Sequence, residues 1–342
     1  MQHNKQLDGL RCLSFLFVFF GHNQILPGSF AALGVNIFFA LSGYLITKIL
    51  VLSETGNVFN DLKIFYIRRM LRIFPVYYVF LLFLLSLGLL PYAIWHFCYL
   101  WNIKMFLIDP NPYFVNHFWS LCVEEQFYIL YAPLLLFTAR EKRIALFSVL
   151  IIISMILNTI CCFTIPDMPF NFLLPIRGQY LIWGCLFGLL DLKYENKTLP
   201  ATTIVFAGAL MNWPYIWMFD NIKDFGFADT LSGIGSALIV FGLWRNKNKI
   251  IKLIFANRIA TYLGKISYGL YIFHLFSLPA FEFFAFLFPV LQSLEKTTAY
   301  LITTILIASL SWFGLERPVN NLKNHFPYGI KPEKSPVAPD AN

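Results

Sequence analysis

The stretch IRRMLRIFPVYYVFLLFLLSLGLL, residues 67–90, decides the fold of this chain. It passes from a cluster of arginines into a run, 73–90, that carries no charged residue. An apolar run of about 17 to 25 residues is long enough to cross the hydrocarbon core of a bilayer as a helix. The stretch therefore predicts a transmembrane helix with its basic end at one membrane surface.

The composition of the whole chain agrees with that prediction. Of the 342 residues, 58% are hydrophobic and 13% are charged, whereas a soluble domain is about half apolar and about a quarter charged. These values exclude disordered, fibrous and ordinary cytosolic proteins. We predict an all-α, polytopic membrane helix bundle of about ten transmembrane helices. The predicted spans are 10–27, 31–52, 73–90, 117–138, 144–165, 173–193, 199–219, 228–244, 262–288 and 297–316.

A further apolar segment, 91–116, is interrupted by prolines and by polar residues. The basic clusters at 63–72 and 140–143 should both be cytoplasmic, so an even number of crossings must separate them. The spans 73–90 and 117–138 already supply two crossings. The segment 91–116 is therefore predicted to be a re-entrant or interfacial piece on the outer side.

The net charge of +8 does not indicate a nucleic-acid partner, because 22 of the 26 Lys and Arg lie in the predicted cytoplasmic segments. That bias is typical of positive-inside topology. It predicts a multi-pass membrane protein, in contact with lipids and with both termini cytoplasmic. The six cysteines show no metal-ligand spacing, so no metal is predicted. Residues 1–326 form one predicted transmembrane domain, and 327–342 a disordered cytoplasmic tail.

Ionisable residues inside apolar spans are candidate functional residues, because burying them in a membrane is costly. Arg11 and His22 are eleven residues apart, which is three helical turns plus about 20°, so they share one face about 16 Å apart. Histidine suits proton transfer near neutral pH. The alternative is that Arg11 anchors the helix at the membrane surface and His22 merely ends it. The spacing leaves both readings open.

The span 117–138 adds two adjacent carboxylates. His117 and Glu124 are seven residues apart and share one stripe, whereas Glu125 points about 100° away. We expect at least one carboxylate to face the bundle interior, in a functional or site-supporting role. The alternative is a structural ion pair with Arg177.

Other candidates have two interpretations each. Arg68, Arg69 and Arg72 suit phosphate binding, but such a loop also binds anionic lipid. Ser42-Gly43 would permit close helix contact. His274 is expected to be a hydrogen-bonded structural residue seven positions after Ser267.

Six segments together resemble the membrane-bound acyltransferase-3 family. They are 7–22, 34–47, 65–78, 117–131, 263–274 and 316–318, in this order. The resemblance implies an enzyme that moves an acyl group, usually acetyl, from cytoplasmic acetyl-coenzyme A to a hydroxyl of a surface glycan or lipid-linked glycan. It also implies a place in a bacterial cytoplasmic (inner) membrane, and it leaves a homo-oligomeric state open.

The resemblance also implies roles for individual residues. His22 would be the general base, and Arg11 would bind the cofactor arm or steady the site. Glu124 or Glu125 would orient His22 or hold the acceptor. Asn36 departs from the family pattern, in which an acidic residue is common there. The implied cofactor-binding residues are Arg68, Arg69, Arg72, Ser42 and Gly43, and the implied supporting residues are His117, Trp119, Ser120 and Arg177.

Two other classes of protein stay open on the sequence. A transporter or flippase of glycan or lipid precursors would also need buried charges in a bundle of helices. A non-catalytic membrane partner would tolerate alanine at His22. A transporter and a non-catalytic partner would not cleave a thioester, whereas an acyltransferase would, so thioester cleavage distinguishes the classes.

Overall fold

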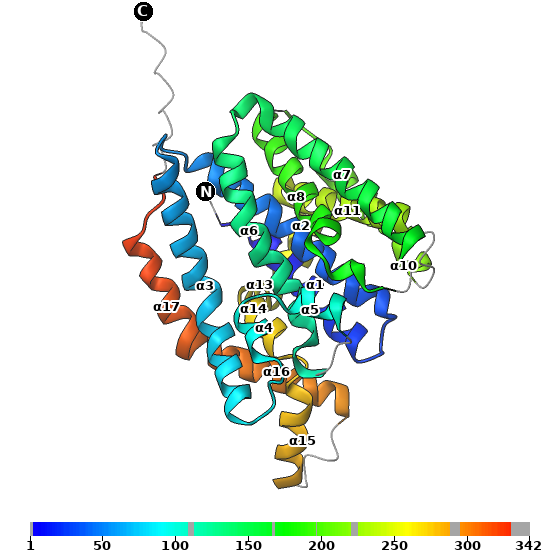
Figure 1. Ribbon diagram of the computed structural model, residues 1–342, viewed down its shortest axis with the longest axis vertical. Helices are drawn as coiled ribbons and strands as arrows, with labels where there is room; N and C mark the ends of the chain where they lie inside the picture. Colours follow the sequence, from blue (N-terminus) through cyan, green and yellow to red (C-terminus); the bar gives the residue numbers. More distant parts are fainter. Residues whose placement is uncertain are drawn as a thin grey trace, which may run out of the picture.

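The computed structural model describes residues 3–108, 113–165, 168–195, 197–219, 225–287 and 295–329. These residues form helices and connecting turns, and no strand occurs among them, which confirms the all-α prediction (Figure 1). Residues 330–342, most of the predicted tail, lie outside the described residues.

The helices vary from five to 29 residues. They are α1 Lys5–His22, α2 Gly28–Leu52, α3 Val58–Ser86, α4 Ala93–Phe97, α5 Trp101–Leu107, α6 Trp119–Phe137, α7 Arg143–Thr164, α8 Leu174–Lys193, α9 Ala201–Met211, α10 Trp213–Met218, α11 Phe225–Arg245, α12 Lys249–Phe255, α13 Arg258–Lys265, α14 Ser267–Phe273, α15 Ser277–Leu287, α16 Lys296–Ser311 and α17 Arg317–Asn321. A 3-10 helix, Tyr113–Phe118, precedes α6.

Among the described residues, six helices are long and apolar enough to cross a membrane, or seven if α14 and α15, bent by 71°, form one span. The chain is thus a multi-pass membrane protein, and the count of about ten spans stays a prediction. The expected span 199–219 is not one continuous helix. It breaks at Asn212 between α9 and α10, because Pro214 cannot donate to the preceding turn and its ring clashes with it.

The segment 91–116 folds back onto the bundle. Its helices α4 and α5 are about 8 and 11 Å long at 1.5 Å per residue, too short to cross a bilayer. Tyr77 and Tyr78 of α3 donate hydrogen bonds to the carbonyls of His96 and Phe97, at 2.9 and 3.1 Å. Residues 109–112 lie outside the described part of the chain.

Polar contacts join the basic segments at one end of the bundle. Glu54, before α3, forms ion pairs with Arg140 and Arg143, before and at the start of α7. Asp191 at the end of α8 binds both Lys48 of α2 and Arg245 of α11. These pairs place segments 48–72, 139–143, 191–199 and 245–265 on the same side, as the positive-inside pattern requires. Assigning that side to the cytoplasm stays a prediction.

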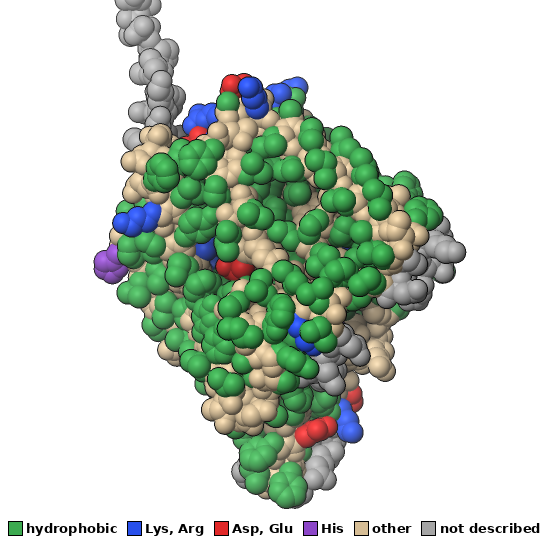
Figure 2. Space-filling model, viewed as in Figure 1, with side chains coloured by type: hydrophobic (Ala, Val, Ile, Leu, Met, Phe, Trp, Pro, Cys, Tyr) green, Lys and Arg blue, Asp and Glu red, His purple; other side chains and the backbone are tan. Residues whose placement is uncertain are grey.

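The outer surface of the bundle is mostly apolar. Figure 2 shows hydrophobic side chains over most of one face, with basic side chains gathered at its upper end. Helix α7 illustrates this, because Ile152, Ile156 and Phe163 are exposed along its length. Such a surface is stable in acyl chains and would be unstable in water.

Small residues bring α2 and α8 into close contact. A Cβ atom on Gly43 would lie 2.0 Å from the carbonyl oxygen of Leu181, and one on Gly184 would lie 2.0 Å from that of Ala40. Glycine at these positions lets the two backbones touch. Gly43 therefore serves helix packing, as the Ser42-Gly43 pair suggested.

Replacing Gly43 by alanine is expected to lower the free energy of unfolding by about 1–3 kcal/mol, because the added methyl group overlaps the backbone of α8. Thermal unfolding of the purified protein in detergent measures this. Gly314→Ala is the control, since its Cβ would meet no atom within 4 Å. Equal melting temperatures for the two variants would contradict the prediction.

Candidate active site

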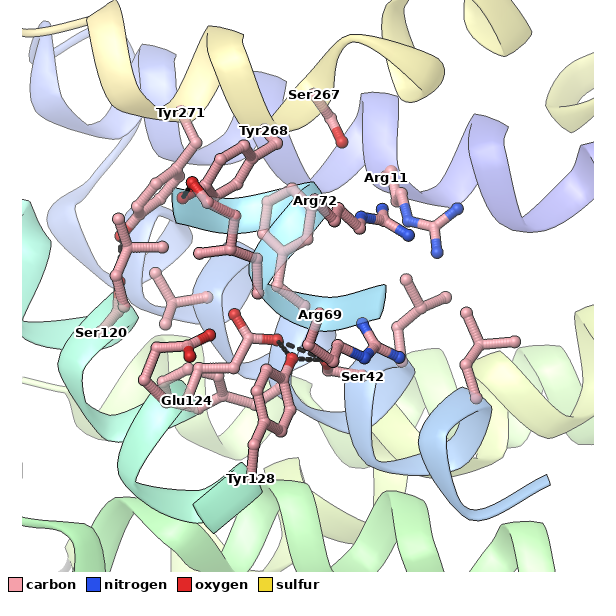
Figure 3. Close-up of a pocket in the computed structure, with 18 residues that line it drawn as sticks. Arg11, Ser42, Arg69, Arg72, Ser120, Glu124, Tyr128, Ser267, Tyr268 and Tyr271 are labelled. Carbon is pink, nitrogen blue, oxygen red and sulfur yellow. Dashed lines mark hydrogen bonds between the residues drawn. The ribbon is translucent and has the colours of Figure 1, made fainter. Parts of the chain in front are cut away.

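A cavity of about 100 Å³, lined by polar as well as apolar side chains, lies inside the bundle between α1, α2, α3, α6 and α14. That volume has room for several water molecules. Figure 3 shows three arginines at one end of the cavity and Ser120 and Tyr271 at the other. The polar lining residues are Arg11, Ser42, Arg69, Arg72, Ser120, Glu124, Glu125, Tyr128, Ser267, Tyr268 and Tyr271.

Helix α3 carries two of the arginines into the cavity. Arg69 and Arg72 are three residues apart, so they lie on one helix face, which also buries Phe65. The Arg69 guanidinium lies over the rings of Phe65 and Tyr128, 5.7 and 5.2 Å from their centroids. Among the described residues, no carboxylate lies within ion-pair distance of Arg69 or Arg72. Two unneutralised cations at one end of a membrane-domain cavity favour an anionic ligand.

Arg68 does not line the cavity, so its expected role in binding the cofactor stays a prediction. Its guanidinium donates to the carbonyls of Lys323 and Phe326, at 2.7 and 2.8 Å, and lies 4.3 Å from the ring centroid of Tyr328. One residue along a helix turns a side chain by about 100°, which separates Arg68 from its neighbour Arg69.

The third arginine comes from α1. Arg11 lines the cavity and donates to Asp8, one turn earlier, at 2.8 Å. This ion pair neutralises Arg11. Arg69 and Arg72 are therefore the cavity arginines without a carboxylate partner among the described residues.

Helix α6 supplies the acidic wall of the cavity. Ser120, Glu124 and Tyr128 are four residues apart and form one line along the helix. The hydroxyls of Ser42 and Tyr128 both donate to the same oxygen, Oε1, of Glu124. Within the described residues no hydrogen bond occupies Oε2 of Glu124. Glu125 also lines the cavity, and it forms no ion pair with a described residue.

His22 is oriented by another histidine. The hydrogen-bond partners of Glu124 lie instead on α2 and α6, so of the two roles expected for Glu124 or Glu125, holding the acceptor stays a prediction. The Nδ1 atom of His22 lies 2.9 Å from Nε2 of His274, and the two rings are inclined by 11°. His117 completes the group, with its ring centroid 4.5 Å from that of His274.

The three histidines lie outside the cavity lining but are linked to it. The Tyr271 hydroxyl lies 2.5 Å from that of Ser120, and both donate to the carbonyl of His117, at 3.1 and 3.0 Å. The Tyr271 carbonyl accepts a hydrogen bond from Nδ1 of His274 at 2.7 Å. Tyr271 thus joins the cavity to His22 through His274.

The remaining predicted residues pack around the site. Trp119 contacts the rings of Phe39 and Phe172, with centroids 6.2 and 5.0 Å apart. Arg177 lies 3.5 Å from Asp229, so it is not the ion-pair partner of the α6 carboxylates. Asn36 is buried and donates to Ser232 at 3.2 Å. Trp119, Arg177 and Asn36 do not line the cavity.

Sequence reasoning undervalued three residues that the structure places at or beside the site, namely Tyr128, Tyr271 and His274. A signal for them existed. Ser267, Tyr271 and His274 follow the helical spacing of four and three residues, and Tyr128 is one turn beyond Glu124. These patterns are common in packed helices, so they do not single out a site.

Comparison with known proteins gives the family. A family model described as an acyltransferase domain, Acyl_transf_3, matches residues 4–313. A Staphylococcus aureus protein named "Putative O-acetyltransferase" is 30% identical over 80% of this chain and 50% of its own length. The Listeria monocytogenes "Peptidoglycan O-acetyltransferase OatA" is 25% identical over 94% of this chain and 56% of its own. The Bacillus subtilis "Putative peptidoglycan O-acetyltransferase YrhL" is 26% identical over 93% and 55%.

The chain spans about half the length of these curated relatives. No solved structure matches it significantly. The family model, by contrast, covers nearly all of the helical bundle and every polar residue of the cavity. This multi-pass membrane protein belongs to the acyltransferase-3 family.

Proposed function

We propose that the protein transfers an acetyl group from acetyl-coenzyme A to a hydroxyl of a cell-surface glycan or lipid-linked glycan, at a bacterial inner membrane. The observation that carries the proposal is the cavity itself. One end holds two arginines without carboxylate partners, and the other end leads through Tyr271 and His274 to His22.

The donor fits the basic end of the cavity. Arg69 and Arg72 present planar guanidinium groups, which bind phosphate through pairs of charge-assisted hydrogen bonds. The cavity of about 100 Å³ has room for a small reactive end but not for a whole coenzyme. When bound, acetyl-coenzyme A supplies an activated acetyl thioester, and its leaving thiol, with a pKa of about 8.5, needs no strong general acid.

The proposed base, His22, lies beyond the end of the cavity that is opposite to the arginines. We propose that His22 takes the proton of the acceptor hydroxyl as its oxygen bonds to the acetyl carbon and the carbon–sulfur bond breaks. His22 is exposed at the end of α1, whereas His274 and His117 are buried behind it. An acceptor can therefore reach His22 from the side away from the basic segments. General-base help of this kind is worth about 10²- to 10⁴-fold in rate.

Ser42, Tyr128 and Glu124 form the wall between the two ends. Two hydroxyls donate to Oε1 of Glu124, which holds this carboxylate in place and leaves Oε2 for a ligand. We propose that Glu124 binds a hydroxyl or amide group of the substrates. Glu125, which also lines the cavity, is proposed to take part in the same binding.

The experiment supplies membranes containing the protein with deuterated acetyl-coenzyme A and purified glycan strands, peptidoglycan first because the relative OatA is named for it. Mass spectrometry should detect alkali-labile deuterated acetate on the glycan, with release of one free thiol per acetate. Membranes lacking the protein are the control. Absence of both thiol release and acetylation with every glycan acceptor would contradict the proposal and favour a transporter.

A further inference from the structure

We propose that His274 is a positioning residue that sets the tautomer of His22, placing the proton on Nδ1 and leaving Nε2 as the free, basic nitrogen. The catalytic consequence rests on the proposed role of His22 as the base. The tautomer itself follows from the positions of three groups, namely the carbonyl of Tyr271 and the two imidazole rings.

The first step concerns His274. Its Nδ1 atom lies 2.7 Å from the carbonyl oxygen of Tyr271. A carbonyl oxygen can only accept a hydrogen bond, so Nδ1 of His274 carries the proton. In a neutral imidazole one nitrogen is the donor and the other the acceptor, so Nε2 of His274 is an acceptor.

The second step concerns His22. Its Nδ1 atom lies 2.9 Å from that acceptor nitrogen. Two acceptors cannot form a hydrogen bond, so Nδ1 of His22 must be the donor. The small inclination of 11° between the rings lets the Nδ1–H bond point along the plane of the His274 ring, toward its lone pair. His22 then has its lone pair on Nε2, at the ring position farther from His274.

The fold holds His274 in a single orientation. Helix α14 ends at Phe273 and the chain bends by 71° into α15, which frees the last carbonyls of α14 from helical hydrogen bonds. The carbonyl of Tyr271 is one of these. The carbonyl of His274 accepts from Ser277 at 2.7 Å, and Ser277 accepts from Thr304 at 2.7 Å. These bonds anchor the backbone from which the His274 ring projects.

Aromatic rings confine the His274 side chain, which is 2% exposed. The ring of Phe15 meets it edge-on at 6.4 Å between centroids, and that of His117 lies at 4.5 Å and 68°. The ring therefore has no room to flip and exchange its two nitrogens. Among the described residues no carboxylate lies within ion-pair distance of His22, so His274 is the group that decides its tautomer.

The arrangement suits a base that becomes charged. When Nε2 of His22 accepts a proton, the imidazolium keeps its Nδ1–H bond to a neutral acceptor, and that bond strengthens because its donor is now ionised. A fixed tautomer also removes the need to rotate the ring before each turnover. Both effects act on the rate of transfer and leave binding of acetyl-coenzyme A unchanged.

The direct test is nitrogen NMR of the purified full chain, labelled with ¹⁵N-histidine, at about pH 8, where an unperturbed imidazole is neutral. The His22 signals are identified by their loss in His22→Asn. We expect a protonated Nδ1 and a bare Nε2 for His22. A proton on Nε2 would overturn the proposal, whether or not the protein transfers acetyl groups.

The second test uses two substitutions at the same position. His274→Leu removes the acceptor, so kcat should fall about 10- to 100-fold, the loss of one buried hydrogen bond, with KM for acetyl-coenzyme A unchanged. His274→Gln keeps a carbonyl oxygen near the position of Nε2 and should recover most of the rate. Equal loss in both folded variants would show a merely structural role and overturn the proposal.

The two readouts separate this inference from the proposed function. The expected tautomer in a protein that transfers no acetyl group would support the inference and contradict the function. A proton on Nε2 of His22 in a protein that transfers acetyl groups would contradict the inference and support the proposed function. If His274→Leu fails to accumulate, the spectrum of the unsubstituted protein still decides the question.

Discussion

Replacing His22 by alanine is expected to lower the rate of acetyl transfer about 10²- to 10⁴-fold while acetyl-coenzyme A still binds, because the acceptor hydroxyl loses its general base. The reason lies in the geometry, since His22 is the exposed member of the histidine group and the only one that an acceptor can reach among the described residues. Thiol release and ester-linked acetate, measured at equal amounts of protein, report the effect.

His325→Ala is the control for His22→Ala. His325 is exposed in the turn after α17, where it contacts the carbonyl of Leu322, far along the chain from the cavity residues. It should retain the unsubstituted rate. A His22→Ala variant that also retains full transfer would remove His22 as the base, although the family membership would stand.

Replacing Arg69 and Arg72 together by glutamine is expected to weaken binding of acetyl-coenzyme A about 10²- to 10⁴-fold. A hydrogen bond to a charged group is worth about 1.5–3 kcal/mol, and two such contacts would be lost. The glutamine side chain is similar in length to that of arginine. The substitution leaves no buried carboxylate without its ion-pair partner, since neither arginine pairs with one among the described residues. Isothermal titration of the purified protein measures the change.

Arg68→Gln is the matched control for the arginine pair. It removes one positive charge from the same helix, half of what the double variant removes, but Arg68 binds the carbonyls of Lys323 and Phe326 outside the cavity. The affinity of this variant for acetyl-coenzyme A should stay within about twofold, because Arg68 does not line the cavity and charges away from a ligand are screened by salt. Equal weakening in both variants would indicate general attraction of anions and would contradict phosphate binding in the cavity.

Much of the site was predictable from the sequence. The pair Arg69 and Arg72 and the pair Ser120 and Glu124 each share a helix face by their spacing alone, and both pairs line the cavity. The spacing of Arg11 and His22 also predicted a shared face. In the structure their contacts differ, because Arg11 lines the cavity and His22 meets His274.

Contacts between distant helices could not be read from the sequence. The sequence grouped Arg68 with its neighbours and left open whether the α6 carboxylates orient His22 or hold the acceptor. In the structure Arg68 forms hydrogen bonds with the C-terminal segment, and His22 forms one with His274. His274 is 252 positions from His22 along the chain. Helical periodicity gives no information about such a distance, since it relates only residues a few turns apart.

The sequence by itself determined those features of the fold that depend on whether a segment lies in water or in lipid. Apolar runs free of charge must be helical in a membrane, and basic loops stay on one side, so the helical bundle and the grouping of its basic segments follow from local composition. Only the tertiary structure decided which polar groups meet. The bend at His274, the close contact of α2 with α8, and the separation of Arg68 from the cavity result from packing between distant helices. That packing depends on the shapes of all the side chains together.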